Sequence, residues 1–180
     1  MNSLSRISPS KPFFEDIMST FKVSSRFREF VGCFGFKRTE YDYTPPSCKV
    51  RHIPEQSRGQ NKIVGPAVEV KAQGPGFECM YGFRYAVDKG DKEMEKDRWS
   101  VRQTAIYQKY DSTFDKVIWI CIGASKETEK YIIEHAISPN RLSVVDLFLI
   151  HAFIIETSLA SWKPYILYLS ERIQDIVCQP

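Results

Sequence analysis

The segment from Trp99 to Gly123 limits the possible folds of this chain more than any other stretch. It contains two runs rich in aromatic and β-branched residues, separated by a polar turn at residues 111–115. This pattern is typical of two antiparallel strands joined by a loop. The second run, Val117 to Ile122, is apolar on both faces, so we predict that it lies in the middle of a sheet with both faces covered.

The first strand of this hairpin places polar side chains in a half-buried run. Arg102 and Gln103 are adjacent, and Tyr107 follows on the same face as Gln103. Burying such groups without partners is costly, so we expect them to be paired. The simpler hypothesis is that Arg102 holds a neighbouring carboxylate or a loop backbone. The alternative is a recognition cluster made of Arg84, Arg102, Gln103 and Tyr107.

The composition is that of one soluble globular domain over residues 1–180. Hydrophobic residues make up 43% of the chain and charged residues 26%, and the net charge of +3 does not favour a nucleic-acid partner. The five cysteines are widely spaced without a C-x-x-C pair, the three histidines are far apart, and the N-terminus does not resemble a signal peptide. We therefore expect free thiols, a cytosolic location and no zinc site.

Two short Phe-rich helices are expected near the N-terminus. Ser10 can cap the first, and Pro12 falls in its first turn, where a missing N–H has no cost. Ser24 or Ser25 can cap the second. The apolar residues recur at helical spacing: Phe13, Phe14, Ile17, Met18 and Phe21, then Phe27, Phe30, Val31 and Phe34. We predict that this helical hairpin packs on the sheet.

Residues 38–76 are rich in proline and glycine and are predicted to form a loop-rich insertion. Arg51 and His52 lie near Arg58 and Lys62 in the sequence. This spacing suggests a small basic patch, and a solvated loop is the simpler interpretation.

Three strands are expected before the central hairpin, at residues 48–53, 67–72 and 77–87. The last has the strongest pattern, because aromatic residues alternate along one of its faces. We predict that this aromatic face points into the core, which places Arg84 on the other face.

Residues 88–97 form a run in which acids alternate with lysines. Asp88, Asp91 and Glu93 are its candidate metal ligands. The spacing does not match a calcium-binding loop, and the neighbouring lysines oppose a cation site. A solvated hairpin loop is therefore the preferred interpretation, with metal binding as the alternative.

A helix capped by Ser125 is expected to end near Ile137 and to precede the longest element, a stalk-like helix over residues 142–178. Pro164 should kink this helix or divide it. Its apolar residues follow alternating steps of three and four, including Phe148, Ile155, Trp162, Ile166 and Ile173. We predict that this stripe covers the sheet and, where the helix projects, forms an interface with a second copy or with another protein.

The C-terminal helix is not expected to cross a membrane. Its most apolar stretch, Val144 to Leu159, contains Asp146, His151 and Glu156, which share no single helical face. A membrane span needs about 20 largely apolar residues.

No catalytic motif is recognisable. The chain has no Gly-rich phosphate loop after a strand and no G-x-S-x-G elbow. Cys121 lies in an apolar run, where a thiol is inert. We therefore predict a protein that is not an enzyme and has no cofactor.

Five stretches carry a recognisable pattern: VSSRFREFVGCFGFK, YGFRYAV, WSVRQTAIYQKYD, VIWICI and HAFIIETSLASWKPYILYLSERI. Together they resemble a family of fungal CorA-like transporter domains, named after the CorA magnesium channel. The resemblance implies a cytosolic α/β (α+β) domain, in which a small, mostly antiparallel sheet is flanked by N-terminal helices and a long stalk helix. The membrane helices and the Gly-Met-Asn motif of the channels do not occur in this sequence. We therefore expect a soluble stand-alone version or a fragment of a membrane protein.

Three functions are compatible with these expectations. The preferred hypothesis is a non-catalytic cytosolic regulatory or interaction domain that self-associates through its C-terminal helix. The second, which rests on the resemblance to the channel's cytosolic domain, is a sensor of divalent cations with magnesium as the candidate ion and with ligands among residues 88–97 or at Asp146, Glu171 and Asp175. The third is an enzyme that holds an anionic substrate at the cluster of Arg84, Arg102, Gln103 and Tyr107.

Overall fold

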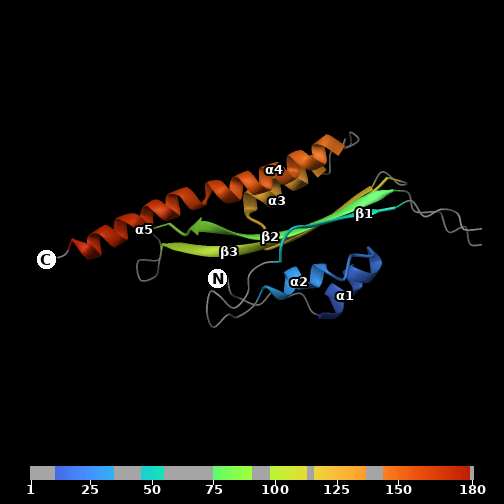
Figure 1. Ribbon diagram of the computed structural model, residues 1–180, viewed down its shortest axis with the longest axis horizontal. Helices are drawn as coiled ribbons and strands as arrows, with labels where there is room; N and C mark the ends of the chain where they lie inside the picture. The colour runs from blue at the N-terminus through green and yellow to red at the C-terminus, as the bar shows by residue number, and fades with distance from the viewer. Residues whose placement is uncertain are drawn as a thin grey trace, which may run out of the picture. The chain divides into compact units, whose positions relative to one another are not determined.

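The computed structural model describes residues 11–34, 46–54, 75–90, 98–112, 116–136 and 144–178, without the side chains of residues 144–146. Its elements, in chain order, are α1 (Lys11–Thr20), α2 (Phe27–Gly32), β1 (Lys49–Ile53), β2 (Gly76–Asp88), β3 (Trp99–Asp111), β4 (Lys116–Ile122), α3 (Lys126–Ala136), α4 (Val144–Ala160) and α5 (Trp162–Val177) (Figure 1). Helices combine with a four-stranded antiparallel sheet, which confirms the predicted fold class. The strand predicted at residues 67–72 lies outside the described residues.

The sheet has the strand order β1-β2-β3-β4. Lys49 of β1 lies opposite Met80 of β2, and Ala105 of β3 lies opposite Ile122 of β4. The prediction that residues 117–122 form a central strand is therefore wrong, because β4 is an edge strand of the described sheet. A strand that is apolar on both faces indicates that other parts of the protein cover both faces. The pattern does not indicate whether the backbone of the strand is paired on both edges.

The chain divides into two compact units. The first, called here the N-terminal unit, contains residues 6–82 and 105–122; the second, the C-terminal unit, contains residues 1–5, 83–104 and 123–180. Strands β2 and β3 each contribute residues to both units.

The core of the N-terminal unit forms between its two helices and the strands. Phe27 and Phe30 of α2 are fully buried with Met80 and Tyr107, and the rings of Phe27 and Tyr107 lie 5.3 Å apart. This confirms the prediction of a Phe-rich helical hairpin packed on the sheet. The aromatic face of β2 is buried at Tyr81 and Tyr85, as predicted, and the opposite face is buried as well. Met80 on one face and Tyr81 on the other are both buried, because the helices cover the face opposite the aromatic residues.

Helices α3 and α4 pack on one another in the C-terminal unit. The Ser125 hydroxyl oxygen accepts a hydrogen bond from the Thr128 N–H (3.1 Å), which confirms the predicted cap of α3. The ring of Tyr131 on α3 stacks on Phe153 of α4 at 3.7 Å. This contact fixes one side of α4 against its neighbour.

The buried face of α4 differs from the predicted one. Leu147, Ile150 and Ile154 are buried, whereas Phe148 is 61% exposed and Ile155 is 45% exposed. The prediction that the Phe148–Ile155 stripe covers the sheet is therefore wrong. Apolar residues surround most of α4, so their spacing alone cannot select the face that packs.

The predicted C-terminal helix is divided in two, and the division falls at Ser161, three residues before Pro164. Helix α4 ends at Ala160 and α5 begins at Trp162, although the Ser161 backbone keeps right-handed helical angles. Pro164 lies in the first turn of α5 and has no N–H to donate to the Ala160 carbonyl, so the hydrogen-bond ladder is interrupted while the direction is kept (Figure 1). No residue of α5 is buried.

The junction between α4 and α5 protects an edge of the sheet. Strand β1 pairs with residues 76–80 of β2. Within the described sheet, residues 81–88 of β2 therefore have no strand partner on the β1 side. There, the Ala86 N–H donates to the Ser161 hydroxyl (3.0 Å), and the indole N–H of Trp162 donates to the Arg84 carbonyl (3.0 Å). Two side chains of the junction thus satisfy backbone groups that would otherwise invite edge pairing.

Candidate functional site

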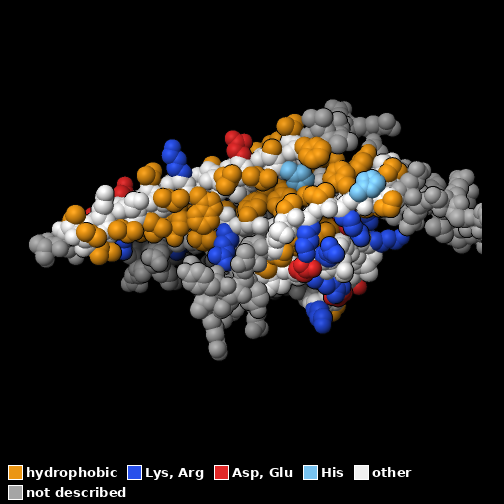
Figure 2. All heavy atoms as spheres, in the orientation of Figure 1, with side chains coloured by type: hydrophobic (Ala, Val, Ile, Leu, Met, Phe, Trp, Pro, Cys, Tyr) orange, Lys and Arg blue, Asp and Glu red, His pale blue; other side chains and the backbone are white. Residues whose placement is uncertain are grey.

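A pocket of about 410 Å³ opens on the N-terminal unit. Its lining residues come from the turn after α1, from β1 and the residue beyond it, and from β2 and β3: Lys22, Arg51, His52, Ile53, Pro54, Glu78 and Lys109. Lysine and arginine side chains gather over the region of α1, α2 and β1 (Figure 2). The pocket therefore combines a small volume with a basic lining.

Among the described residues of this lining, Glu78 is the only acidic one, and both of its carboxylate oxygens are paired. The side chain is buried, and its Oε2 accepts hydrogen bonds from Nε (3.0 Å) and Nη2 (2.7 Å) of Arg51. Its Oε1 accepts one from the Tyr107 hydroxyl at 2.9 Å. Burial and the negative charge of Glu78 raise the pKa of Tyr107, so its hydroxyl remains a donor at neutral pH. A buried charge is thus neutralised within the protein.

Lys109 is the buried cation of the pocket. Its side chain belongs to a residue only 7% exposed, and Nζ donates to the Lys22 carbonyl oxygen over 3.4 Å. No carboxylate lies within ion-pair distance of this ammonium in the described part of the chain. A neutral carbonyl at the long limit of hydrogen bonding compensates a buried charge poorly.

The turn that ends α1 positions Lys22. The Val23 N–H donates to the Met18 carbonyl (2.9 Å) and the Lys22 N–H to the Ser19 carbonyl (3.2 Å), the two bonds of a Schellman motif. Lys22 occupies the left-handed position of this motif with φ +48°, where glycine is the usual residue. The turn therefore keeps a strained lysine at the rim of the pocket.

The predicted recognition cluster is distributed over both units. Tyr107 belongs to the N-terminal unit and is paired with Glu78, whereas Arg84, Arg102 and Gln103 belong to the C-terminal unit. Arg102 lies near Tyr85: its charge opposes the effect of burial, which is larger and raises the pKa of Tyr85. The Arg102 Nε is buried and has no hydrogen-bond partner among the described residues.

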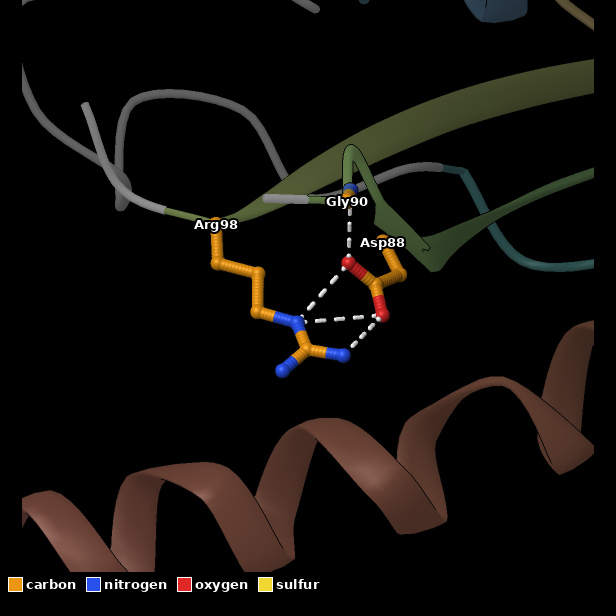
Figure 3. Close-up of polar contacts among 3 residues, drawn as sticks. All are labelled: Asp88, Gly90 and Arg98. Carbon is orange, nitrogen blue, oxygen red and sulfur yellow. Dashed lines mark hydrogen bonds and ion pairs between the residues drawn. The ribbon is translucent and has the colours of Figure 1, made fainter. Parts of the chain in front are cut away.

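One of the predicted metal ligands, Asp88, is occupied by other groups of the protein. Its carboxylate accepts hydrogen bonds from the Arg98 guanidinium (2.8–3.2 Å) and from the Gly90 N–H (2.9 Å), as Figure 3 shows. The hydrogen bonds from Arg98 are the main reason that the pKa of Asp88 is lowered. Asp91 and Glu93 lie outside the described residues, and within the described ranges no three His, Cys, Asp or Glu side chains converge on a common point.

The half-buried thiols of Cys79 and Cys121 are poor nucleophiles. Burial raises the pKa of Cys121 to about 12, and burial followed by the proximity of Cys48 raises the pKa of Cys79 to about 12. Both side chains are therefore neutral thiols at physiological pH, which agrees with the expectation that Cys121 is inert.

The pocket itself was not predicted from the sequence. Arg51 and His52 were noted as a basic patch, while Arg58 and Lys62 lie outside the described residues. Glu78 and Lys109 were missed, although each is a charged residue within a strand rich in aromatic and apolar residues. That signal identifies buried charges, but pairing of β1 with β2 is needed to show that Arg51 meets Glu78.

Comparison with known proteins yields one match. None of the described helices is both long enough and apolar enough to span a membrane. No curated protein and no solved structure matches the chain. The family of CorA-like transporters matches residues 1–179, almost the entire sequence, and the chain therefore belongs to the CorA-like family.

Proposed function

We propose that this chain is a non-catalytic, cytosolic regulatory or interaction domain of the CorA-like family, which associates with a second copy of itself through α4 and α5. The observation that carries the proposal is a continuous apolar stripe left exposed along both helices. Figure 2 displays hydrophobic side chains along the full length of these helices.

The stripe has the spacing of a helical interface. Its members alternate in steps of four and three over four repeats: Phe148, Ala152, Ile155, Leu159, Trp162, Ile166, Leu169, Ile173 and Ile176. Phe148, Leu159, Ile166, Ile173 and Ile176 are each more than half exposed. Trp162 is partly used inside the unit, because its indole N–H reaches the Arg84 carbonyl. A seven-residue apolar repeat matches another helix with the same repeat better than it matches a flat sheet.

The energetics of α5 favour the same partner. Most of the stability of a helix in a protein comes from the packing of its apolar face, and none of the 16 residues of α5 is buried. A second copy of α4–α5 would supply the apolar surface that the described part of the chain does not, and it would carry the same repeat. Self-association is therefore the arrangement that these helices support best.

The proposal is tested by light scattering coupled to size exclusion over a wide range of protein concentration. We expect a mass that rises to that of an oligomer. The Ile173→Lys variant should shift the equilibrium to monomer, because it places a charge in the repeat. The matched control is Gln174→Lys, which introduces the same charge at the adjacent exposed position outside the repeat and should behave as the native protein.

Two results would overturn the proposal. One is a native protein that stays strictly monomeric at high concentration. The other is equal association of the native protein and the Ile173→Lys variant, with circular dichroism confirming that both are folded. Since neither residue 173 nor residue 174 is buried, both variants should retain the native fold.

A further inference from the structure

We propose that the pocket on the N-terminal unit is a binding site for a small oxyanion, a phosphate or carboxylate group of a metabolite-sized ligand. The site is formed by Lys109 at its base and by Lys22 and Arg51 at its rim. It is independent of the α4–α5 stripe, because the described lining residues all belong to the N-terminal unit.

The charge of the lining selects an anion. Three cationic side chains face one carboxylate, and that carboxylate is already neutralised by Arg51 and the Tyr107 hydroxyl. A cation entering the pocket would find no free acidic oxygen, since both oxygens of Glu78 accept hydrogen bonds. An anion would supply the counter-charge that Lys109 does not have among the described residues.

The donors of the pocket suit an oxyanion in geometry as well as in charge. Glu78 takes the Nε and Nη2 donors of Arg51, and the guanidinium has further N–H groups on a side chain that is 61% exposed. Arg51 can therefore bridge the internal carboxylate and an external anion without breaking its ion pair. Lys22 and Lys109 belong to the same lining and carry ammonium donors. The His52 side chain is not counted among the donors, because His52 follows Arg51 on β1 and points to the other face of the sheet.

The arrangement is more costly than a purely structural role requires. An apolar side chain at position 109 would avoid burying an ammonium without a counter-ion. A glycine at position 22 would relieve the left-handed backbone angle. The buried Lys109 and the left-handed backbone at Lys22 are both unfavourable, and they occur in one pocket, where the Lys22 carbonyl contacts Lys109. Unfavourable features of this kind cluster at ligand sites.

The volume limits the ligand to a small molecule. About 410 Å³ is near the lower end of the range for small-molecule sites. This space accommodates a phosphorylated or polycarboxylated metabolite, with its anionic group on the lysines and its remainder against Ile53 and Pro54.

The test is isothermal titration calorimetry of the full chain in a buffer without competing oxyanions. Inorganic phosphate, pyrophosphate and citrate are the probes, and their relative heats distinguish a phosphate group from a carboxylate group. We expect saturable binding of at least one probe at or below about 1 mM. Lys109→Met should weaken that binding by at least about tenfold, and Lys22→Gln by about threefold or more.

The matched control is Lys49→Gln. Lys49 lies on β1 two residues before Arg51, and its ammonium is paired with Glu29 outside the pocket. Its loss changes the net charge as much as Lys22→Gln does, so it should leave the affinity within about twofold of the native value if the pocket is the site. Lys22 is exposed, so Lys22→Gln decides the question even if Lys109→Met does not fold.

The proposal is overturned if none of the three probes gives saturable heat at concentrations up to about 10 mM. It is equally overturned if Lys22→Gln and Lys49→Gln weaken binding to the same extent, because the effect would then come from net charge alone.

Discussion

Helices α2 and α5 both carry apolar residues at helical spacing, but α2 buries these residues and α5 exposes them. Helix α2 has 6 residues and buries Phe27 and Phe30 almost completely, whereas α5 has 16 residues and buries none. Neither helix has a side-chain hydrogen bond at its N-cap. Local helix signals therefore do not distinguish them. The difference lies in what each helix finds to pack against within its own unit.

This comparison shows that apolar spacing specifies a face without specifying its partner. For α2 the partner is internal, and Met80 and Tyr107 close the core around it. For α5 the described unit offers the ring of Trp99, which contacts Tyr165 at 5.6 Å and Tyr168 at 6.4 Å, while the apolar repeat on another side stays exposed. The exposed apolar face of α5 is therefore available for association.

The largest expected effect separates these two helices directly. Phe27→Ala should lower the free energy of unfolding by about 3–5 kcal/mol, because it empties a fully buried ring site. Ile173→Ala, measured at a protein concentration low enough for monomer, should change it by about 0.5 kcal/mol or less. Urea denaturation followed by circular dichroism gives both values. Equal losses would mean that α5 is buried in the monomer and would remove the contrast.

A second prediction compares a buried tyrosine of each unit. Tyr107→Phe leaves an oxygen of the buried Glu78 carboxylate without its donor and should cost about 1.5–3 kcal/mol. Tyr85→Phe removes a hydrogen bond to the neutral Gly123 carbonyl (2.9 Å) and should cost about 0.5–1.5 kcal/mol. The same denaturation experiment measures the difference, and a larger loss at Tyr85 would contradict the assignment of Glu78 as a buried charge.

A third prediction concerns the pH dependence of the C-terminal unit. Burial lowers the pKa of His151 on α4 from its usual 6.5 to about 4. The unfolded chain therefore takes up a proton between pH 6.5 and about 4 while the folded chain does not, so stability is present above pH 6.5 and is lost as the pH falls towards 4. The loss should amount to about 1–3 kcal/mol.

His151→Leu should remove most of this loss, as measured by urea midpoints at a series of pH values. If the native protein and His151→Leu lose stability equally over this range, the protonation of His151 is not responsible.

Among the polar contacts, the smallest effect is expected at the exposed ion pair between Asp88 and Arg98. Arg98→Gln should reduce the free energy of unfolding by about 1 kcal/mol or less, because water screens both groups. The contribution is present above the usual carboxyl pKa of 3.8 and is lost as the pH falls through the lowered pKa of Asp88. Added salt should weaken it further, and a loss as large as that of Tyr107→Phe would show that the pair is not solvent-screened.

The sequence predictions were accurate where the structure depends on residues close together in the chain. Strands β2, β3 and β4 were found within a few residues, as were the Ser125 cap and the break near Pro164, because each depends on neighbours in the chain. The position of β4 in the sheet and the buried face of α4 were predicted wrongly. Both depend on which distant element supplies the contact.

The candidate site shows the same limit. The sequence shows that Glu78 and Lys109 are charged residues within predicted strands, but it does not show which residues lie next to them. Glu78 meets Arg51 only because β1 and β2 pair in a register that places Arg51 opposite it. Lys109 contacts the Lys22 carbonyl although the two residues are 87 positions apart in the sequence.

The sequence by itself determined that the chain is a mixed helix and strand protein with an antiparallel hairpin and a divided C-terminal rod, because propensity, periodicity and proline act locally. Tertiary structure alone decided which apolar faces are buried and which charges share a pocket. The physical reason is that burial and electrostatic pairing depend on distance in space, and strand register and helix docking bring together residues that no local pattern connects.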